Sequence, residues 1–121
     1  MSKGIDIGEY ISKISKCMEE LYSDKLDLSK YEFKDLAMQS YSAVIDGVKN
    51  NKRELIDNGF INLYQVTDAR IGKTGINKYG NDSRERQLFD IIHNTIGEMY
   101  KMMDIDLESF ITEMAKKAHI E

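Results

Sequence analysis

The sequence predicts an all-α fold, a single-domain bundle of four to five mostly antiparallel helices, and three observations support this prediction. The chain of 121 residues contains no proline, whereas a domain of this size would on average contain about six. Apolar residues recur three and four positions apart in five segments, the spacing that places them on one side of a helix. No segment alternates apolar and polar residues between turn signals, as a half-buried strand would.

The five segments define the helices that we expect. Their approximate bounds are 5–22, 30–49, 52–70, 83–103 and 106–119. The first carries an apolar stripe from Ile7 to Leu21, and the second follows Ser29 and Glu32, which have the spacing of a capping box. Gly59 interrupts the third helix, where a glycine costs about 1 kcal/mol relative to alanine.

The last two helices are expected to form a hairpin around which the rest of the chain packs. Apolar residues between positions 83 and 103 form one broad face that includes Ile92, and Asp106 is a candidate N-cap for the final helix. Asp82 or Ser83 is expected to cap the helix before it. Because a four-helix core will not absorb every apolar stripe, we also predict self-association through the helices at 5–22 and 83–103.

Composition excludes several classes of protein. Cys17 is the only cysteine, so the chain forms no internal disulfide and no cysteine-based zinc site, and a reducing cytoplasm is the expected location. No apolar run approaches the ~20 residues of a membrane span, and the N-terminus lacks the pattern of a signal peptide. A net charge of -4 and the lack of a basic recognition helix argue against sequence-specific DNA binding.

Positive charge is concentrated around the glycine-rich loop at 72–81. Residues 49–86 carry 8 basic and 5 acidic side chains, between two acidic ends. A phosphate-binding P-loop does not fit, because Thr67 occupies the position of its first glycine and the preceding segment is helical. A looser anion site, such as one for a nucleotide's phosphates, remains open beside a plain solvated loop. Its candidate residues are Arg70, Lys73, Lys78, Arg84 and Arg86.

Carboxylates at helical spacing give a second candidate site. Glu32 and Asp35 share a face of the second helix, and Asp90 and Glu98 lie two turns apart on the fourth. If these helices pack antiparallel, the four acids can face each other and hold Mg²⁺, which prefers oxygen ligands. The alternative is a solvated acidic surface. His93 follows Asp90 by three and could add a metal ligand, although a structural histidine is the simpler interpretation.

Two blocks of sequence resemble a known family. The block from Gln87 to Glu108 and the block from Glu32 to Ala37 resemble the MazG-type all-α nucleoside triphosphate pyrophosphohydrolases, in which an E-x-x-E-L-A helix and an E-x-x-D helix precede a G-I-D-L-E-like turn. The resemblance implies that acids hold magnesium, which activates water to attack a nucleotide's phosphates. Gln87 and Tyr31 stand where the family has acids, so weakened metal binding and a degenerate, binding-only scaffold are expected.

Two functions therefore remain open. The first is a nucleotide-handling or nucleotide-binding protein similar to the MazG type, with Mg²⁺ as its cofactor and a nucleotide or other phosphate-bearing molecule as its ligand. The second is a non-enzymatic helical interaction module, such as an inhibitor, an adaptor or a small-ligand sequestering protein. Such a module would bind a partner protein or a second copy through methionine-rich and aromatic faces, which adapt to several partners.

Overall fold

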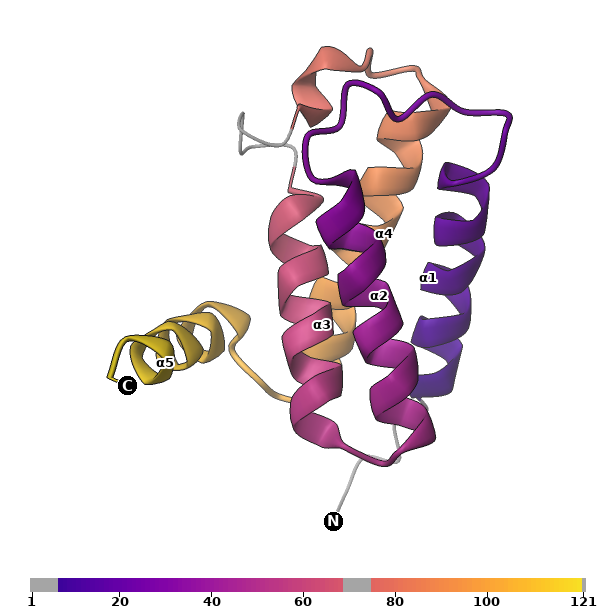
Figure 1. The fold of residues 1–121 in the computed structure, drawn as a ribbon. Coiled ribbons are helices and arrows are strands. Elements are labelled where there is room, and N and C mark those ends of the chain that lie inside the picture. The colour runs from indigo at the N-terminus through magenta and orange to yellow at the C-terminus, as the bar shows by residue number, and fades with distance from the viewer. Residues whose placement is uncertain (1–6, 69–74, 121) are drawn as a thin grey trace.

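The computed structural model describes residues 7–68 and 75–120, and of residues 114, 115 and 117–120 it describes the backbone alone. These ranges contain five α-helices and a short 3₁₀ turn and no strand, which confirms the predicted all-α helical bundle (Figure 1). The elements are α1 (Ile7–Leu21), α2 (Lys34–Lys49), α3 (Arg53–Val66), η2 (Ile76–Lys78), α4 (Arg84–Met102) and α5 (Leu107–Ile120).

The first four helices form an up-down-up-down bundle, and each runs antiparallel to the next along the chain (Figure 1). The most extensive backbone contacts join α2 to α3 and α1 to α4, followed by α3 to α4. Helices α2 and α4 therefore lie across the bundle from each other and run in the same direction. This arrangement decides which predicted site residues can meet.

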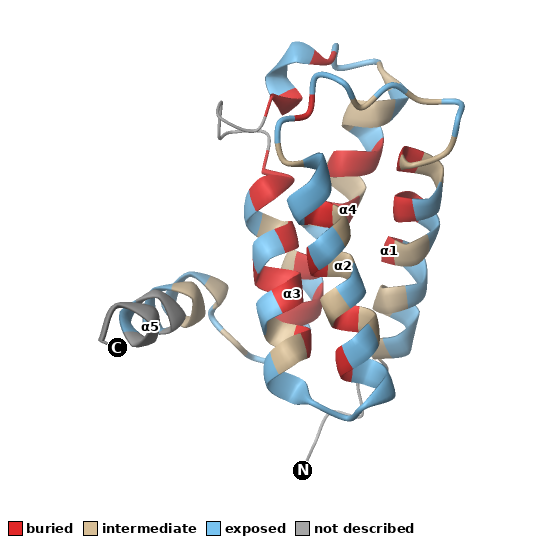
Figure 2. Ribbon diagram, in the orientation of Figure 1, coloured by how far each residue is buried: buried red, intermediate tan, exposed pale blue. Residues whose placement is uncertain are grey.

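One continuous core fills the space between the four helices (Figure 2). The fully buried side chains include Ile14 and Met18 of α1 and Ile92 and Ile96 of α4, each at most 2% exposed. The apolar stripes of α1 and α4 thus cover each other inside the core. Both stripes also include apolar residues that are only partly buried, such as Ile11, so the predicted self-association through these two helices stays a prediction.

Helices α2 and α3 approach closely because glycines lie where they meet. A Cβ atom at Gly59 would lie 2.5 Å from the carbonyl oxygen of Ser40 and 2.6 Å from Cγ2 of Val44. A Cβ atom at Gly47 would lie 2.7 Å from Cγ1 of Ile56. Gly59 therefore has a packing function that outweighs its intrinsic cost within a helix.

The start of α2 differs from the prediction. The helix begins at Lys34, and Phe33 occupies its N-cap position without a side-chain hydrogen bond. Tyr31 is only 2% exposed; its hydroxyl donates to the carbonyl oxygen of Val66 at 3.1 Å, and its ring lies 4.6 Å from the ring of Phe89. The capping box predicted at Ser29 was wrong, because burial of Tyr31 against other segments holds this stretch outside the helix.

The start of α4 agrees with one of the two predicted caps. The hydroxyl of Ser83 accepts a hydrogen bond from the backbone N–H of Arg86 at 3.1 Å, as an N-cap residue does. In the same turn, the carboxylate of Glu85 accepts from the backbone N–H of Asp27 at 3.1 Å. This contact attaches the first turn of α4 to the segment between α1 and α2.

Helix α5 leaves the four-helix bundle after a sharp turn at Asp104, whose φ is 62° (Figure 1). Asp106 precedes the helix, and its carbonyl oxygen accepts from the N–H of Phe110 at 2.9 Å, while its carboxylate accepts from the hydroxyl of Ser109 at 2.9 Å. Among the described side chains of α5, Leu107 and Phe110, in its first turns, pack against the edge of the core.

Candidate functional site

The predicted metal ligands belong to segments that are not neighbours in the bundle. Glu32 and Asp35 are exposed near the start of α2, whereas Asp90 and Glu98 lie on α4, across the bundle. Within the described part of the chain, no three His, Cys, Asp or Glu side chains are grouped so that they could hold a metal ion. The structure therefore does not bring the four acids together, and the predicted Mg²⁺ site stays a prediction.

Asp90 and His93 have partners of other kinds. Arg86 lies one turn before Asp90, with its Nε atom 3.7 Å from the carboxylate. The ring of His93 stacks on the ring of Tyr64, with centroids 4.0 Å apart, and its Nδ1 atom lies 2.7 Å from the carbonyl oxygen of Tyr64. The histidine thus connects α4 to the last turn of α3. These contacts are those expected of a structural histidine.

The predicted anion-binding residues are only partly described. Arg70 and Lys73 lie outside the described residues. Arg84 forms a two-pronged ion pair with Glu20 of α1, with nitrogen-to-oxygen distances of 2.5 and 2.8 Å. This hydrogen bonding lowers the pKa of the Glu20 carboxyl below its ordinary value. Arg84 therefore joins α1 to α4, and its charge is already balanced.

The other two basic residues of the set differ from each other. Lys78 is exposed on η2 and forms no ion pair with another described residue. Arg86 is about four-fifths buried. Its Nε atom lies 3.7 Å from the carboxylate of Asp90, which is too far for a hydrogen bond, and this atom has no hydrogen-bond partner. Of the three described basic residues in this set, only Lys78 is therefore unpaired and available to a phosphate group, since Arg84 and Arg86 already face carboxylates.

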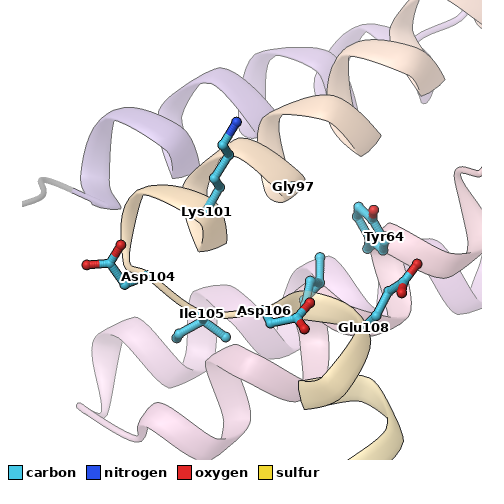
Figure 3. A pocket seen from close by; sticks show the side chains of 8 residues that line it. Tyr64, Gly97, Lys101, Asp104, Ile105, Asp106 and Glu108 are labelled. Carbon is cyan, nitrogen blue, oxygen red and sulfur yellow. The ribbon is translucent and has the colours of Figure 1, made fainter.

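A hollow of about 450 Å³ opens on the side of the bundle, between α3, α4 and the start of α5 (Figure 3). Its lining consists of Tyr64, Gly97, Lys101, Asp104, Ile105, Asp106, Leu107 and Glu108. Glu108 lies beside Tyr64, whereas Lys101 and Asp104 extend away from that ring (Figure 3). With three carboxylates and one ammonium group, this hollow disfavours the phosphates of a nucleotide.

A polar network fixes the place where the chain leaves the bundle for α5. The buried hydroxyl of Tyr100 donates to the carboxylate of Asp57 at 2.5 Å, and Arg53 pairs with the same carboxylate at 3.0 Å. Arg53 also reaches the sulfur of Met103 at 3.5 Å. Burial, and then the hydrogen bond to Asp57, raise the pKa of the Tyr100 phenol well above its ordinary value.

Only part of this network leaves a signal in the sequence. The spacing of Arg53 and Asp57 at four positions is typical of an ion pair on one helix. Tyr100 lies 43 positions after Asp57, and no local pattern relates the two residues. The carboxylate of Asp57 is thus engaged by both a guanidinium and a phenol.

Apolar side chains remain uncovered near the same end of the molecule. The ring of Phe110 lies 5.9 Å from that of Tyr100, so this side of α5 packs against the bundle. Ile111 is half-buried but is not among the residues that pack against the core. Met102 and Val48 are 51% and 46% exposed at the ends of α4 and α2. This end therefore offers apolar contact area beside charged groups.

Comparison with known proteins gave no match for this chain: no family model, no curated protein and no solved structure aligns with it. Among the described residues, no helix is both long and apolar enough to cross a membrane.

Proposed function

We propose that the chain is a non-enzymatic helical interaction module that works as a homo-oligomer, with α5 as part of its contact surface. The observation that carries this proposal is the position of α5, which projects from a bundle that is already closed by four helices (Figures 1 and 2). Every residue of the buried core cluster belongs to α1–α4 or to the segments that connect them.

The two apolar sides of α5 have different surroundings. Phe110 packs against Tyr100 and the core edge, so it holds the helix in place. Ile111 is the next residue, about 100° further around the helix, and it lies apart from the core. Complete burial of an isoleucine stabilises a folded or bound state by roughly 1.5–3 kcal/mol. Because Ile111 is already half-buried, a partner that covers the rest of it would gain roughly half of this free energy.

The proposal predicts that Ile111→Asp weakens self-association without unfolding the monomer. Its dissociation constant should rise at least about tenfold, because a carboxylate replaces an apolar contact in the interface. Sedimentation velocity over a range of concentrations measures this change. The matched control is Thr112→Asp, which introduces the same charge at an exposed neighbouring position and should change the constant little. Equal effects of the two variants would count against a contact through Ile111.

Nucleotide binding is the second candidate, and one observation favours it. The unpaired Lys78 precedes the N-terminus of α4 by six residues, and the N-terminus of a helix attracts anions. Calorimetry with magnesium and a panel of nucleoside triphosphates tests this candidate. Binding heat together with a raised melting temperature would support it. No heat and no thermal shift in any combination would remove it, and a shift without turnover would indicate a binding-only scaffold.

A further inference from the structure

Two patches of opposite charge lie at the end of the bundle where α5 departs. The basic patch consists of Lys49, Lys52 and Arg53, at the turn between α2 and α3, where Glu54 also lies. The acidic patch consists of Asp106, just before α5, and of Glu108 and Glu113, in the first half of α5; all of these residues are exposed. The contact of Arg53 with Met103, three residues before Asp106, brings the basic patch near the beginning of the acidic patch.

Arg53 pairs with Asp57, but other charges in these patches have no ion-pair partner among the described residues. Lys49, Lys52, Glu108 and Glu113 form no ion pair with another described residue. Exposed apolar side chains accompany both patches: Val48 adjoins the basic patch at the end of α2, and Met102 ends α4 close to the acidic patch. An apolar centre with a polar rim is the usual anatomy of a protein interface, and complementary charges at the rim orient the partners.

We propose that this end of the bundle binds a second copy of the chain about a twofold axis, so that the basic patch of each copy faces the acidic patch of the other. The proposal rests on the homo-oligomer proposed above and names its surface. A twofold axis brings the same surface of both copies together, so each contact occurs twice. Adjacent patches of opposite sign are complementary to themselves under this operation, and such complementarity fixes the register of the partners.

Reversal of one patch at a time tests this arrangement. In Lys49→Glu/Lys52→Glu, acidic groups would face the acidic patch of an identical copy. In Glu108→Lys/Glu113→Lys, basic groups would face the basic patch. Each variant alone should dissociate at a concentration at least about tenfold higher than the unmodified chain, because like charges oppose each other at both contacts. Arg53 is left unchanged, since it pairs with Asp57.

An equimolar mixture of the two variants should restore the dimer. The reversed basic patch of one variant then faces the reversed acidic patch of the other, while the second contact keeps its native charges. Sedimentation velocity should give a dissociation constant within about threefold of that of the unmodified chain. The charge-matched control is Lys13→Glu/Lys16→Glu, at exposed positions of α1, and its dimer should be unaffected. Circular dichroism checks that each variant is folded.

Three outcomes would overturn the proposal, and they differ in what else they affect. If both patch variants formed a dimer as stable as that of the unmodified chain, these surfaces would be refuted as the interface, but the proposed homo-oligomer would not be. Two weakened variants whose mixture stays monomeric would refute the twofold exchange of patches. A monomeric unmodified chain at every concentration would refute this proposal together with the proposed function.

Discussion

Replacement of Ile92 by aspartate is expected to unfold the domain or to leave it without a cooperative melting transition. Ile92 has no exposed surface, and it belongs to the core cluster to which α1–α4 all contribute. An unpaired buried carboxylate adds a desolvation cost of several kcal/mol, and the lost apolar burial adds roughly 1.5–3 kcal/mol. The total free energy of unfolding of a domain is only about 5–15 kcal/mol. Thermal unfolding followed by circular dichroism measures the effect.

The matched control for this variant is Asn94→Asp. Asn94 lies on the same helix and is exposed, so the same new charge should change the free energy of unfolding by no more than about 0.5 kcal/mol. An unchanged melting midpoint for Ile92→Asp would show that the helical phase of α4 differs from the one described.

Replacement of Gly59 by alanine should also destabilise the protein, although alanine favours a helix by about 1 kcal/mol over glycine. The added Cβ would lie 2.5 Å from a backbone oxygen of α2, and a backbone atom within a helix cannot move aside as a side chain can. Helices α2 and α3 would have to separate, and such overpacking typically costs about 1–3 kcal/mol after repacking. Urea denaturation gives the change in the free energy of unfolding.

Gly97→Ala provides the helical control for this result. A Cβ atom at Gly97 would meet Cε1 of Tyr64 at 3.3 Å, which is a side-chain atom at the edge of the open hollow. The ring can shift by a few tenths of an ångström, so the intrinsic preference for alanine should offset most of the cost. If Gly59→Ala were as stable as Gly97→Ala, the close approach of α2 and α3 would not depend on the glycine.

The helices could be predicted from the sequence because their signal is local. Apolar residues at intervals of three and four identify both the helix and its buried face, as they do for Ile92 and Ile96 in α4. A cap is also local, and Ser83 was one of the two residues expected to begin α4. The beginning of α2 could not be predicted from local signals. Its position depends on Tyr31, which is kept outside the helix by contacts with Val66 and Phe89, and both residues are distant in the sequence.

The partners of each helix could not be predicted, and the candidate sites depended on them. Helical spacing shows which face of α4 is apolar, but it does not show that α1 rather than α2 covers that face. For the same reason, the spacing of Glu32 and Asp90 gave no measure of their separation across the bundle. The pairing of Arg84 with Glu20, 64 positions apart, has no local signal either.

The central claim is that this closed bundle, with α5 projecting from it, associates with further copies of itself. The most direct test is the molar mass of the unmodified chain by light scattering, at concentrations up to ~100 μM, because self-association follows mass action. The monomer has a mass of 14.0 kDa. We predict a mass of about twice this value at the highest concentration, which falls towards 14.0 kDa on dilution. A mass of 14.0 kDa at every concentration would contradict the claim.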